Sequence, residues 1–104
     1  MATPIEASAS LTDATTGVGS TVDFTSPVAS VSMMLIPSGE ISSGVVVVEA
    51  SHDGVNWVKL DGFNAAEPVN QAHRNTAGAF RYWRSNIIAD IVGGGSVTTT
   101  FMGV

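Results

Sequence analysis

Cysteine is absent from this sequence of 104 residues. Without thiols the chain can form neither a disulfide framework nor a thiolate metal site. Small extracellular domains often depend on such cross-links for their stability. We therefore expect this chain to be stabilised by the packing of its own core or by association with other subunits.

Charged residues are scarce and unevenly balanced. They make up 12% of the sequence, and the net charge is −5 because nine carboxylates outnumber four cations: Lys59, Arg74, Arg81 and Arg84. Soluble domains average roughly twice that charged fraction. A protein whose main partner is nucleic acid needs a basic face to neutralise phosphates, so the composition predicts that nucleic acid is not a partner.

Long apolar segments are also missing. No run approaches the ~18 apolar residues that indicate a membrane-spanning helix, and the start of the chain, MATPIEASAS, lacks the basic residues and apolar centre of a secretory signal. The sequence therefore predicts no membrane partner, and a protein that is made in the cytosol and retained or assembled there. Its length suits a single domain with one modest core.

What the sequence does contain is a strongly strand-forming stretch at residues 45–60, VVVVEASHDGVNWVKL. The four valines predict a strand that is buried on both faces or ends in the core. Asp53 and Gly54 predict a hairpin turn, since glycine takes a positive φ without a Cβ clash. The residues after the turn are expected to return as a second strand, with Trp57 as an anchor in the core.

Further strands are predicted by alternating apolar and polar residues. They are expected at residues 1–12, 21–25, 28–37, 78–91 and 97–104, with turns or loops at 13–20, 61–78 and 92–96. The 61–78 connection is expected to be irregular, apart from a short strand near 69–74. The apolar run at 33–36 predicts that both faces of its strand are covered.

No segment shows the period of an amphipathic helix, and the pattern indicates about seven to eight short strands. It predicts an all-β fold, a two-sheet antiparallel β-sandwich that is Ig-like or jelly-roll-like, with a small barrel as the alternative. Residues 1–12 are expected to be an N-terminal arm and first strand, and residues 13–104 a single β-sandwich domain. The apolar residues of the first strand are expected to share one face: Ile5, Ala7, Ala9 and Leu11.

Ser51, His52 and Asp53 are consecutive, and these three residue types make up a hydrolase triad. Neighbouring residues in a strand point to opposite faces, however, and a triad needs its histidine between its two partners in space. The sequence therefore predicts a turn at this position and no catalytic residues. We expect the protein not to be an enzyme.

Metal and cofactor sites are not predicted either. His52 and His73 show no HxH or HExxH spacing, so both are expected to face solvent in loops or turns. The glycine-rich stretches 17–21 and 92–96 lack the GK[ST] of a phosphate loop and are expected to be turns. Five aspartates lie in or near turns but lack the DxDxDG run of a calcium loop: Asp13, Asp23, Asp53, Asp61 and Asp90.

The aromatic residues allow two interpretations. Trp57, Tyr82 and Trp83, together with Phe80, would form a platform for a sugar if they lay on an exposed sheet face. Two tryptophans in a domain of this size usually pack in or against the core instead, and we favour that interpretation. The alternation in 78–91 does not decide whether Tyr82 or Trp83 points inward.

Two arginines flank Trp83. Arg81 and Arg84 are expected to stack on aromatic rings or to pair with acids such as Glu49. The main expected role of such contacts is to stabilise the protein surface, and binding a partner is the secondary one.

Three stretches resemble a known group of proteins. They are V-x-x-E-A-S-H-D-G-V-N-W-V-K-L at 46–60, AFRYWRSNI at 79–87 and VGGGSVTTTFMGV at 92–104. Together they are similar to the hairpin, the later strand and the Thr-rich last strand of small β-sandwich proteins in the virions of tailed bacteriophages. The hairpin is also similar to that of discoidin-like and other carbohydrate-binding sandwiches. The first half of the chain carries no such resemblance.

The resemblance implies a non-enzymatic virion structural protein, a capsid decoration or minor capsid protein that binds and stabilises the capsid surface. A tail or baseplate subunit is the near alternative. A carbohydrate-binding module is the competing class, with Trp57, Tyr82 or Trp83 contacting a surface glycan.

The implied partners are the major capsid protein or other virion proteins and further copies of the chain, in a virion assembled in the host cytoplasm. No cofactor is implied. Residues 1–12 and 61–78 are the candidate contact segments, because extended arms commonly become ordered by adding a strand to a neighbour.

Overall fold

The computed structural model describes residues 5–24, 30–75 and 80–103, and the side chains of residues 5–7 and 75 fall outside this description. The described residues form nine strands and no helix, so none of them belongs to a helix that could cross a membrane. The strands are β1 (Ile5–Ala14), β2 (Gly17–Val18), β3 (Val22–Asp23), β4 (Val31–Ser38), β5 (Ser43–Ser51), β6 (Val58–Asn64), β7 (Gln71–Asn75), β8 (Tyr82–Val92) and β9 (Ser96–Gly103).

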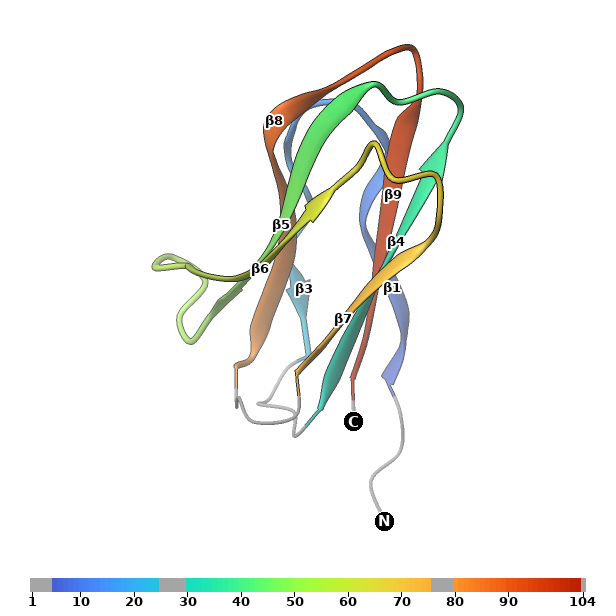
Figure 1. The fold of residues 1–104 in the computed structure, drawn as a ribbon. Coiled ribbons are helices and arrows are strands. Elements are labelled where there is room, and N and C mark those ends of the chain that lie inside the picture. Colours follow the sequence, from blue (N-terminus) through green and yellow to red (C-terminus); the bar gives the residue numbers. More distant parts are fainter. Residues whose placement is uncertain (1–4, 25–29, 76–79, 104) are drawn as a thin grey trace.

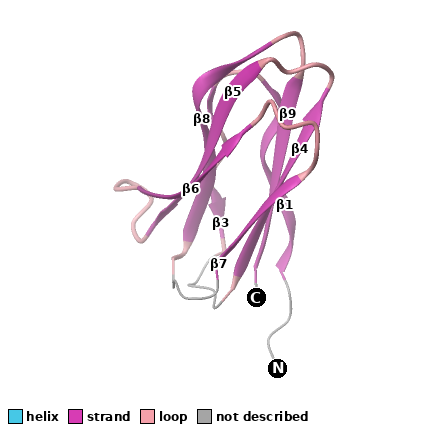
Figure 2. Ribbon diagram, viewed as in Figure 1, coloured by secondary structure: helices cyan, strands magenta, loops and turns pink. Residues whose placement is uncertain are grey.

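The strands lie in two antiparallel sheets that pack face to face (Figure 1, Figure 2). One sheet has the order β1-β9-β4-β7, and the other has the order β2-β8-β5-β6 with β3 also paired to β8. The predicted two-sheet β-sandwich is confirmed, rather than the alternative of a small barrel. More strands are present than predicted because β2 and β3 have two residues each, too few to show a periodicity.

Strand β5 is central in its sheet and pairs with both β6 and β8. Val46, Val47 and Val48 are at most 1% exposed, so the predicted burial on both faces is confirmed for these three, whereas Val45 is half-buried. Val46 and Val48 belong to the core between the sheets. Val47 lies on the outer face beside Gly62, where the stem of Lys59 also lies and helps to cover it.

Trp83 on β8 is the largest buried side chain and connects the two sheets. Its ring lies 6.2 Å from the ring of Phe101 on β9, measured between centroids. Its indole Nε1 donates a hydrogen bond to the carbonyl oxygen of Phe80 at 3.0 Å, which satisfies its polar atom. Trp83 therefore points inward, and Tyr82 points to the outer face.

The predicted boundaries around 61–78 are wrong. The strand after the turn begins at Val58 and continues as β6 to Asn64, because it pairs with β5 over that whole length. Strand β7 then occupies Gln71–Asn75, close to the short strand expected near 69–74. Several ends of the predicted segments lie outside the described residues: 1–4, 25, 28–29, 76–79 and 104.

Strand β4 is covered on one face only, which contradicts the expectation for residues 33–36. Met33 and Leu35 are fully buried in the core, whereas Met34 is 47% exposed. The strand alternates in the usual way, so an apolar run does not by itself place both faces in the interior. Strand β9 alternates as predicted, with Val97, Thr99 and Phe101 buried.

A β-bulge in β1 breaks the alternation predicted for residues 1–12. The pairing with β9 shifts between Ala9 and Leu11, so Ser10 and Leu11 are both buried while Ala9 is exposed. The Ser10 hydroxyl donates to the carbonyl oxygen of Ser20 at 2.8 Å and accepts from the backbone N–H of Ser85 at 2.9 Å. The bulge thereby joins β1 of one sheet to β8 of the other.

Gly19 fits into this junction because it has no side chain. A Cβ at position 19 would lie 2.5 Å from the Ser10 hydroxyl oxygen and 2.6 Å from the Ser10 carbonyl oxygen. At Gly62, by contrast, the nearest atoms would be at the ordinary contact distances of 3.6 Å and 3.7 Å. The two glycines therefore form a matched pair for substitution by alanine, because one position is sterically closed and the other is open.

We expect Gly19→Ala to lower the free energy of unfolding by about 1–3 kcal/mol, because the backbone at the junction must move to admit the methyl group. Gly62→Ala should change it by less than ~0.5 kcal/mol. Urea denaturation of the two variants and the wild type measures both values. Equal stability of the two variants would contradict the steric role of the junction.

Candidate interaction surfaces

The loop between β5 and β6, residues 52–57, projects from the sandwich and is ordered by one carboxylate (Figure 1). Oδ1 of Asp53 accepts hydrogen bonds from the backbone N–H groups of Val55 and Asn56 at 2.8 Å each, and Oδ2 accepts one from the Asn56 amide at 2.8 Å. The Ser51 hydroxyl donates to Oδ1 at 2.9 Å. These bonds, above all that from the Asn56 backbone, hold the pKa of Asp53 well below its usual range.

Ser51, His52 and Asp53 do not converge as a triad. The Ser51 oxygen accepts hydrogen bonds from the backbone N–H groups of Asp53 and Gly54, at 3.2 Å and 2.9 Å. His52 instead stacks on Phe80, with 4.8 Å between the ring centroids. The prediction of a turn is confirmed, and Gly54 has the expected positive φ of 76°.

Trp57 is not the core anchor that the sequence predicts. It is half-buried on the outer face of the second sheet, where the Arg84 guanidinium lies 4.0 Å from its ring centroid. Arg84 Nε also donates to Glu49 Oε1 at 2.8 Å. The predicted pairing of an arginine with Glu49 is confirmed, and it uses the same arginine that stacks on Trp57.

Tyr82 lies under another arginine. Arg81 lies 5.0 Å above the Tyr82 ring and forms two hydrogen bonds to Asp23, at 2.7 Å and 3.0 Å. The hydrogen bond to Asp23 raises the pKa of Arg81. With Trp83 buried and one ring face of both Trp57 and Tyr82 covered by an arginine, the three aromatics do not form an open platform for a sugar.

His73 and Asp61 connect the two sheets at their edges. His73 on β7 belongs to one sheet and Asp61 on β6 to the other, and His73 Nδ1 lies 3.0 Å from Asp61 Oδ2. The His73 side chain is only 11% exposed, so the prediction of a solvent-facing histidine is wrong. The hydrogen bond from His73 is the main cause that lowers the pKa of Asp61.

The described residues contain no group of three histidines or carboxylates that could hold a metal ion. The aspartates that the sequence places near turns lie apart and have local partners, such as Thr16 for Asp90 at 2.8 Å. The stretch 92–96 is the turn between β8 and β9, as predicted, with positive φ at Gly93 and Gly94. Residues 17–18 form the short strand β2 rather than a turn.

One exposed sheet surface, which we call the uncharged face, was not predicted. It comprises the outward residues of β4 and β9: Ser32, Met34, Ile36, Thr98, Thr100 and Met102. Met34 is 47% exposed and Met102 is 44% exposed. The sequence does contain a signal for this face. In both strands, the alternate residues that do not enter the core include no charged side chain.

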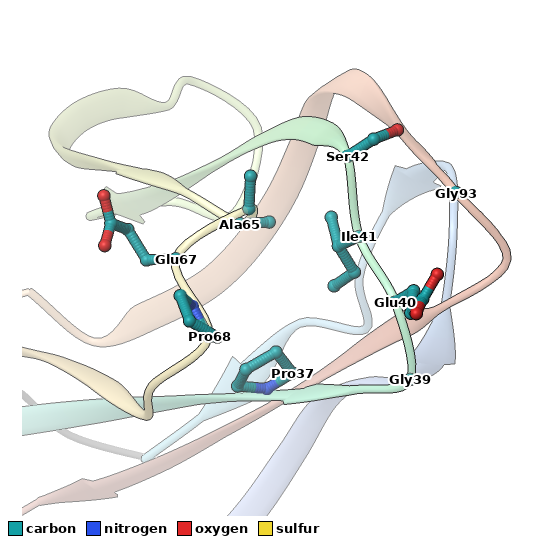
Figure 3. Close-up of a pocket in the computed structure, with 10 residues that line it drawn as sticks. Pro37, Gly39, Glu40, Ile41, Ser42, Ala65, Glu67, Pro68 and Gly93 are labelled. Carbon is teal, nitrogen blue, oxygen red and sulfur yellow. The ribbon is translucent and has the colours of Figure 1, made fainter.

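A pocket of about 420 Å³ opens at one end of the sandwich (Figure 3). It lies between the β4–β5 loop and the β6–β7 loop, with Gly93 of the β8–β9 turn at its side. Its lining includes four apolar residues, Pro37, Ile41, Ala65 and Pro68, together with Glu40 and Glu67, whose carboxylates lie on opposite sides of the opening and point away from each other (Figure 3). The sequence does not reveal this pocket, because its loops are more than twenty residues apart in the chain.

No protein-family model and no curated protein matches the sequence. Among solved structures, the crystal structure of the SPBc2 prophage-derived protein YomS is similar over 99% of this chain and 96% of that chain, with a TM-score of 0.61 and 14% sequence identity. The two proteins share a fold. This likeness extends over almost the whole of both chains, and so includes the first half, in which the sequence alone shows no resemblance.

We expect Asp53→Ala to speed hydrogen exchange of the Val55 and Asn56 amides by about tenfold or more, because both lose their acceptor. The urea midpoint should hardly change, since the loop lies outside the core. Asp53→Asn keeps one acceptor oxygen, so its amide exchange rates should lie between those of the wild type and those of Asp53→Ala. Unchanged exchange in Asp53→Ala would show that the carboxylate does not order the loop.

The Asp61–His73 contact predicts a pH-dependent stability. The pKa of Asp61 is lower in the folded state than in the unfolded state. Its contribution to the free energy of unfolding is therefore fully present above the unfolded-state pKa and is lost as the pH falls through the folded-state pKa. Asp61 is 43% exposed, so we expect Asp61→Asn to cost at most ~1 kcal/mol near neutral pH.

The difference in the free energy of unfolding between Asp61→Asn and the wild type should vanish when the wild-type Asp61 carboxylate is protonated. Urea denaturation at a series of pH values measures it, with Glu67→Gln as the control for an exposed carboxylate that no described cation contacts. A difference that stays constant down to about pH 2 would contradict the assigned role of Asp61.

Proposed function

We propose that this chain is a non-enzymatic structural protein of a tailed-bacteriophage virion, a capsid decoration or minor capsid protein that binds and stabilises the capsid surface. The observation that carries the proposal is the fold shared with a prophage-derived protein over almost the full length of both chains. The hairpin at 46–60 and the strands at 79–87 and 92–104, which resemble virion sandwich proteins, support it.

The surface supports a role in assembly. The uncharged face exposes Met34 and Met102 beside half-buried threonines, and Arg74 on β7 borders it at Ser32, which suits contact with another protein. Its partners in this proposal are the major capsid protein or other virion proteins and further copies of the chain. The protein would be located in the virion, after assembly in the host cytoplasm.

The non-enzymatic part of the proposal is supported by the local chemistry. The hydroxyl of Ser51 and the carboxylate of Asp53 are used within one loop, and His52 packs on a phenylalanine ring. A hydrolase activity that is lost in His52→Ala would contradict this part. The glycan-binding alternative is not favoured, because Trp83 is buried and an arginine covers one ring face of both Trp57 and Tyr82.

We expect the protein to co-sediment with virions of its source phage through a density gradient, in a fixed number of copies per particle. Mass spectrometry of the purified particles measures this, and immunogold labelling separates a capsid position from a tail or baseplate position. Recovery of the protein only in the soluble fraction would contradict a structural role.

The contribution of the N-terminal arm needs a narrow deletion. Residues Ile5–Ala14 form a strand of the sandwich and Leu11 lies in the core, so removal of residues 1–12 would disturb the fold itself. Deletion of residues 1–4 leaves that strand intact. Loss of particle binding in this variant, with unchanged urea stability, would identify the arm as a contact segment.

A further inference from the structure

The loop at residues 52–57 carries an exposed apolar side chain, Val55. It is 78% exposed, more than the other large apolar side chains on the described surface. Figure 1 shows that this loop projects from the sandwich beyond the end of β5. Its backbone is fixed here, because Asp53 accepts the N–H groups of Val55 and Asn56 at 2.8 Å each. The loop therefore has little conformational entropy to lose when Val55 binds a partner.

The base of this loop is supported by Tyr82 and Trp57. A Cβ at Gly54 would lie 3.7 Å from the Tyr82 ring, and the Arg84 guanidinium lies 4.0 Å from the centroid of the Trp57 ring. Arg84 is paired with Glu49, and the other arginine of this region is likewise paired with an aspartate. These ion pairs leave the charge around the loop nearly balanced.

The pocket of about 420 Å³ is an apolar hollow between two other loops (Figure 3). Ile41 of the β4–β5 loop faces Ala65 and Pro68 of the β6–β7 loop. The carboxylates of Glu40 and Glu67 point outward on opposite sides of the opening and leave the space between the loops to apolar side chains. The volume lies in the usual range of roughly 300–1,000 Å³ for binding pockets.

Backbone hydrogen bonds hold both loops of the pocket in place. Ser42 N–H donates to the Val92 carbonyl oxygen at 2.7 Å. On the other side, Ala65 N–H donates to the Gly44 carbonyl oxygen at 3.0 Å. The walls are therefore ordered before anything binds between them.

The 52–57 loop and the pocket lie at opposite ends of β5. The β4–β5 loop leads into this strand at Ser43, and residues 52–57 follow its last residue, Ser51. The nine residues of β5, at ~3.4 Å per residue, separate the two features by roughly 25–30 Å. A molecule cannot place this loop in its own pocket, so a contact between the two features joins different molecules.

We propose that the 52–57 loop of one copy docks into the pocket of a second copy, so that copies associate head to tail. Val55 packs against Ile41 and Pro68 of the neighbouring molecule and is removed from water. Glu40 and Glu67 flank the opening and repel the same end of another copy, which opposes pocket-to-pocket contact. The loop, with its balanced surroundings, meets no such repulsion.

The two surfaces of this contact differ, so each added copy leaves one free loop and one free pocket. Contacts of this kind build rings or open chains. The inference deepens the proposed function, in which further copies of the chain are partners, and rests on it only for the setting of a virion. Many copies held together there would strengthen a contact that is weak between two free molecules.

Sedimentation velocity of the purified protein measures the contact. We expect the average sedimentation coefficient of the wild type to rise with concentration, with half-association between about 10 µM and 1 mM, because one loop buries less than a standard interface. Val55→Asp should stay monomeric, since it would bury a carboxylate among apolar side chains. Val55→Ser should weaken the contact roughly tenfold. A wild type that stays monomeric up to about 1 mM would overturn the proposal.

The pocket has its own variant and each surface has a matched control. Pro68→Asp places a carboxylate in the pocket wall and should also give monomers. Val69→Asp adds the same charge at the next residue, outside the lining, and Val18→Asp changes a valine that is 53% exposed on β2. Both controls should associate as the wild type does. All these positions are exposed, and an unchanged urea midpoint confirms that each variant is folded.

A mixture of the two blocked variants tests the head-to-tail geometry. Val55→Asp keeps an intact pocket and Pro68→Asp keeps an intact loop, so an equimolar mixture should form dimers and nothing larger. A contact of one surface with itself, for example through the uncharged face, would instead let each variant associate alone. The proposal is overturned if either variant alone associates like the wild type, or if the mixture stays monomeric while the wild type associates.

Co-sedimentation with virions separates this inference from the proposed function. If the wild type associates in solution but is absent from the particles, the proposed function fails and the head-to-tail contact stands. If the wild type is present in the particles but monomeric in solution, the contact is overturned and the proposed function stands.

Discussion

The packing of Trp83 against Phe101 is the contact on which the rest of the structure depends, because it joins one sheet to the other in the middle of the core. Buried aromatic rings contribute much of the apolar area of a small domain. Adjacent residues of a strand face opposite ways, so an inward Trp83 places Tyr82 and Arg84 on the outer face. The ion pair of Arg84 with Glu49 and its stacking on Trp57 are consequences of that orientation.

The features that follow from local pattern could be predicted from the sequence. The sandwich class, the buried valines of β5 and the turn at Gly54 depend on neighbours in one strand or on one turn. The pair of Arg84 with Glu49 crosses from β8 to β5, and the sequence predicted it only as one of several contacts open to the two arginines. The core anchor was predicted at Trp57, which is wrong, and the choice between Tyr82 and Trp83 as the inward residue could not be made, since alternation within a strand does not say which face is inside. Contacts such as Asp61–His73 depend on which edge strands face each other across the sandwich, and strand order is decided by long-range pairing.

The two sides of the sandwich are closed by polar contacts of different kinds. On one side Ser10 accepts from the backbone of Ser85, and on the other Asp61 meets His73. These contacts connect the two sheets along both sides of the sandwich. The described surface exposes apolar side chains on both sheets, among them Met34 and Met102 on the uncharged face and Val18 and Ile88 on the other sheet.

The carboxylates Glu40 and Glu67 lie in the loops at one end of the sandwich, whereas those at the other end, Asp23 and Glu49, are paired with arginines. This excess of negative charge at one end gives the molecule a direction. An electric dipole of this kind feels the field of a positively charged surface before contact is made, at separations up to the screening length of roughly 8–10 Å in physiological salt. Encounters would then begin with the carboxylate-rich loops foremost, and fewer collisions would be lost to wrong orientations. The placing of a few side chains thus affects how fast a complex forms, and makes that rate sensitive to ionic strength.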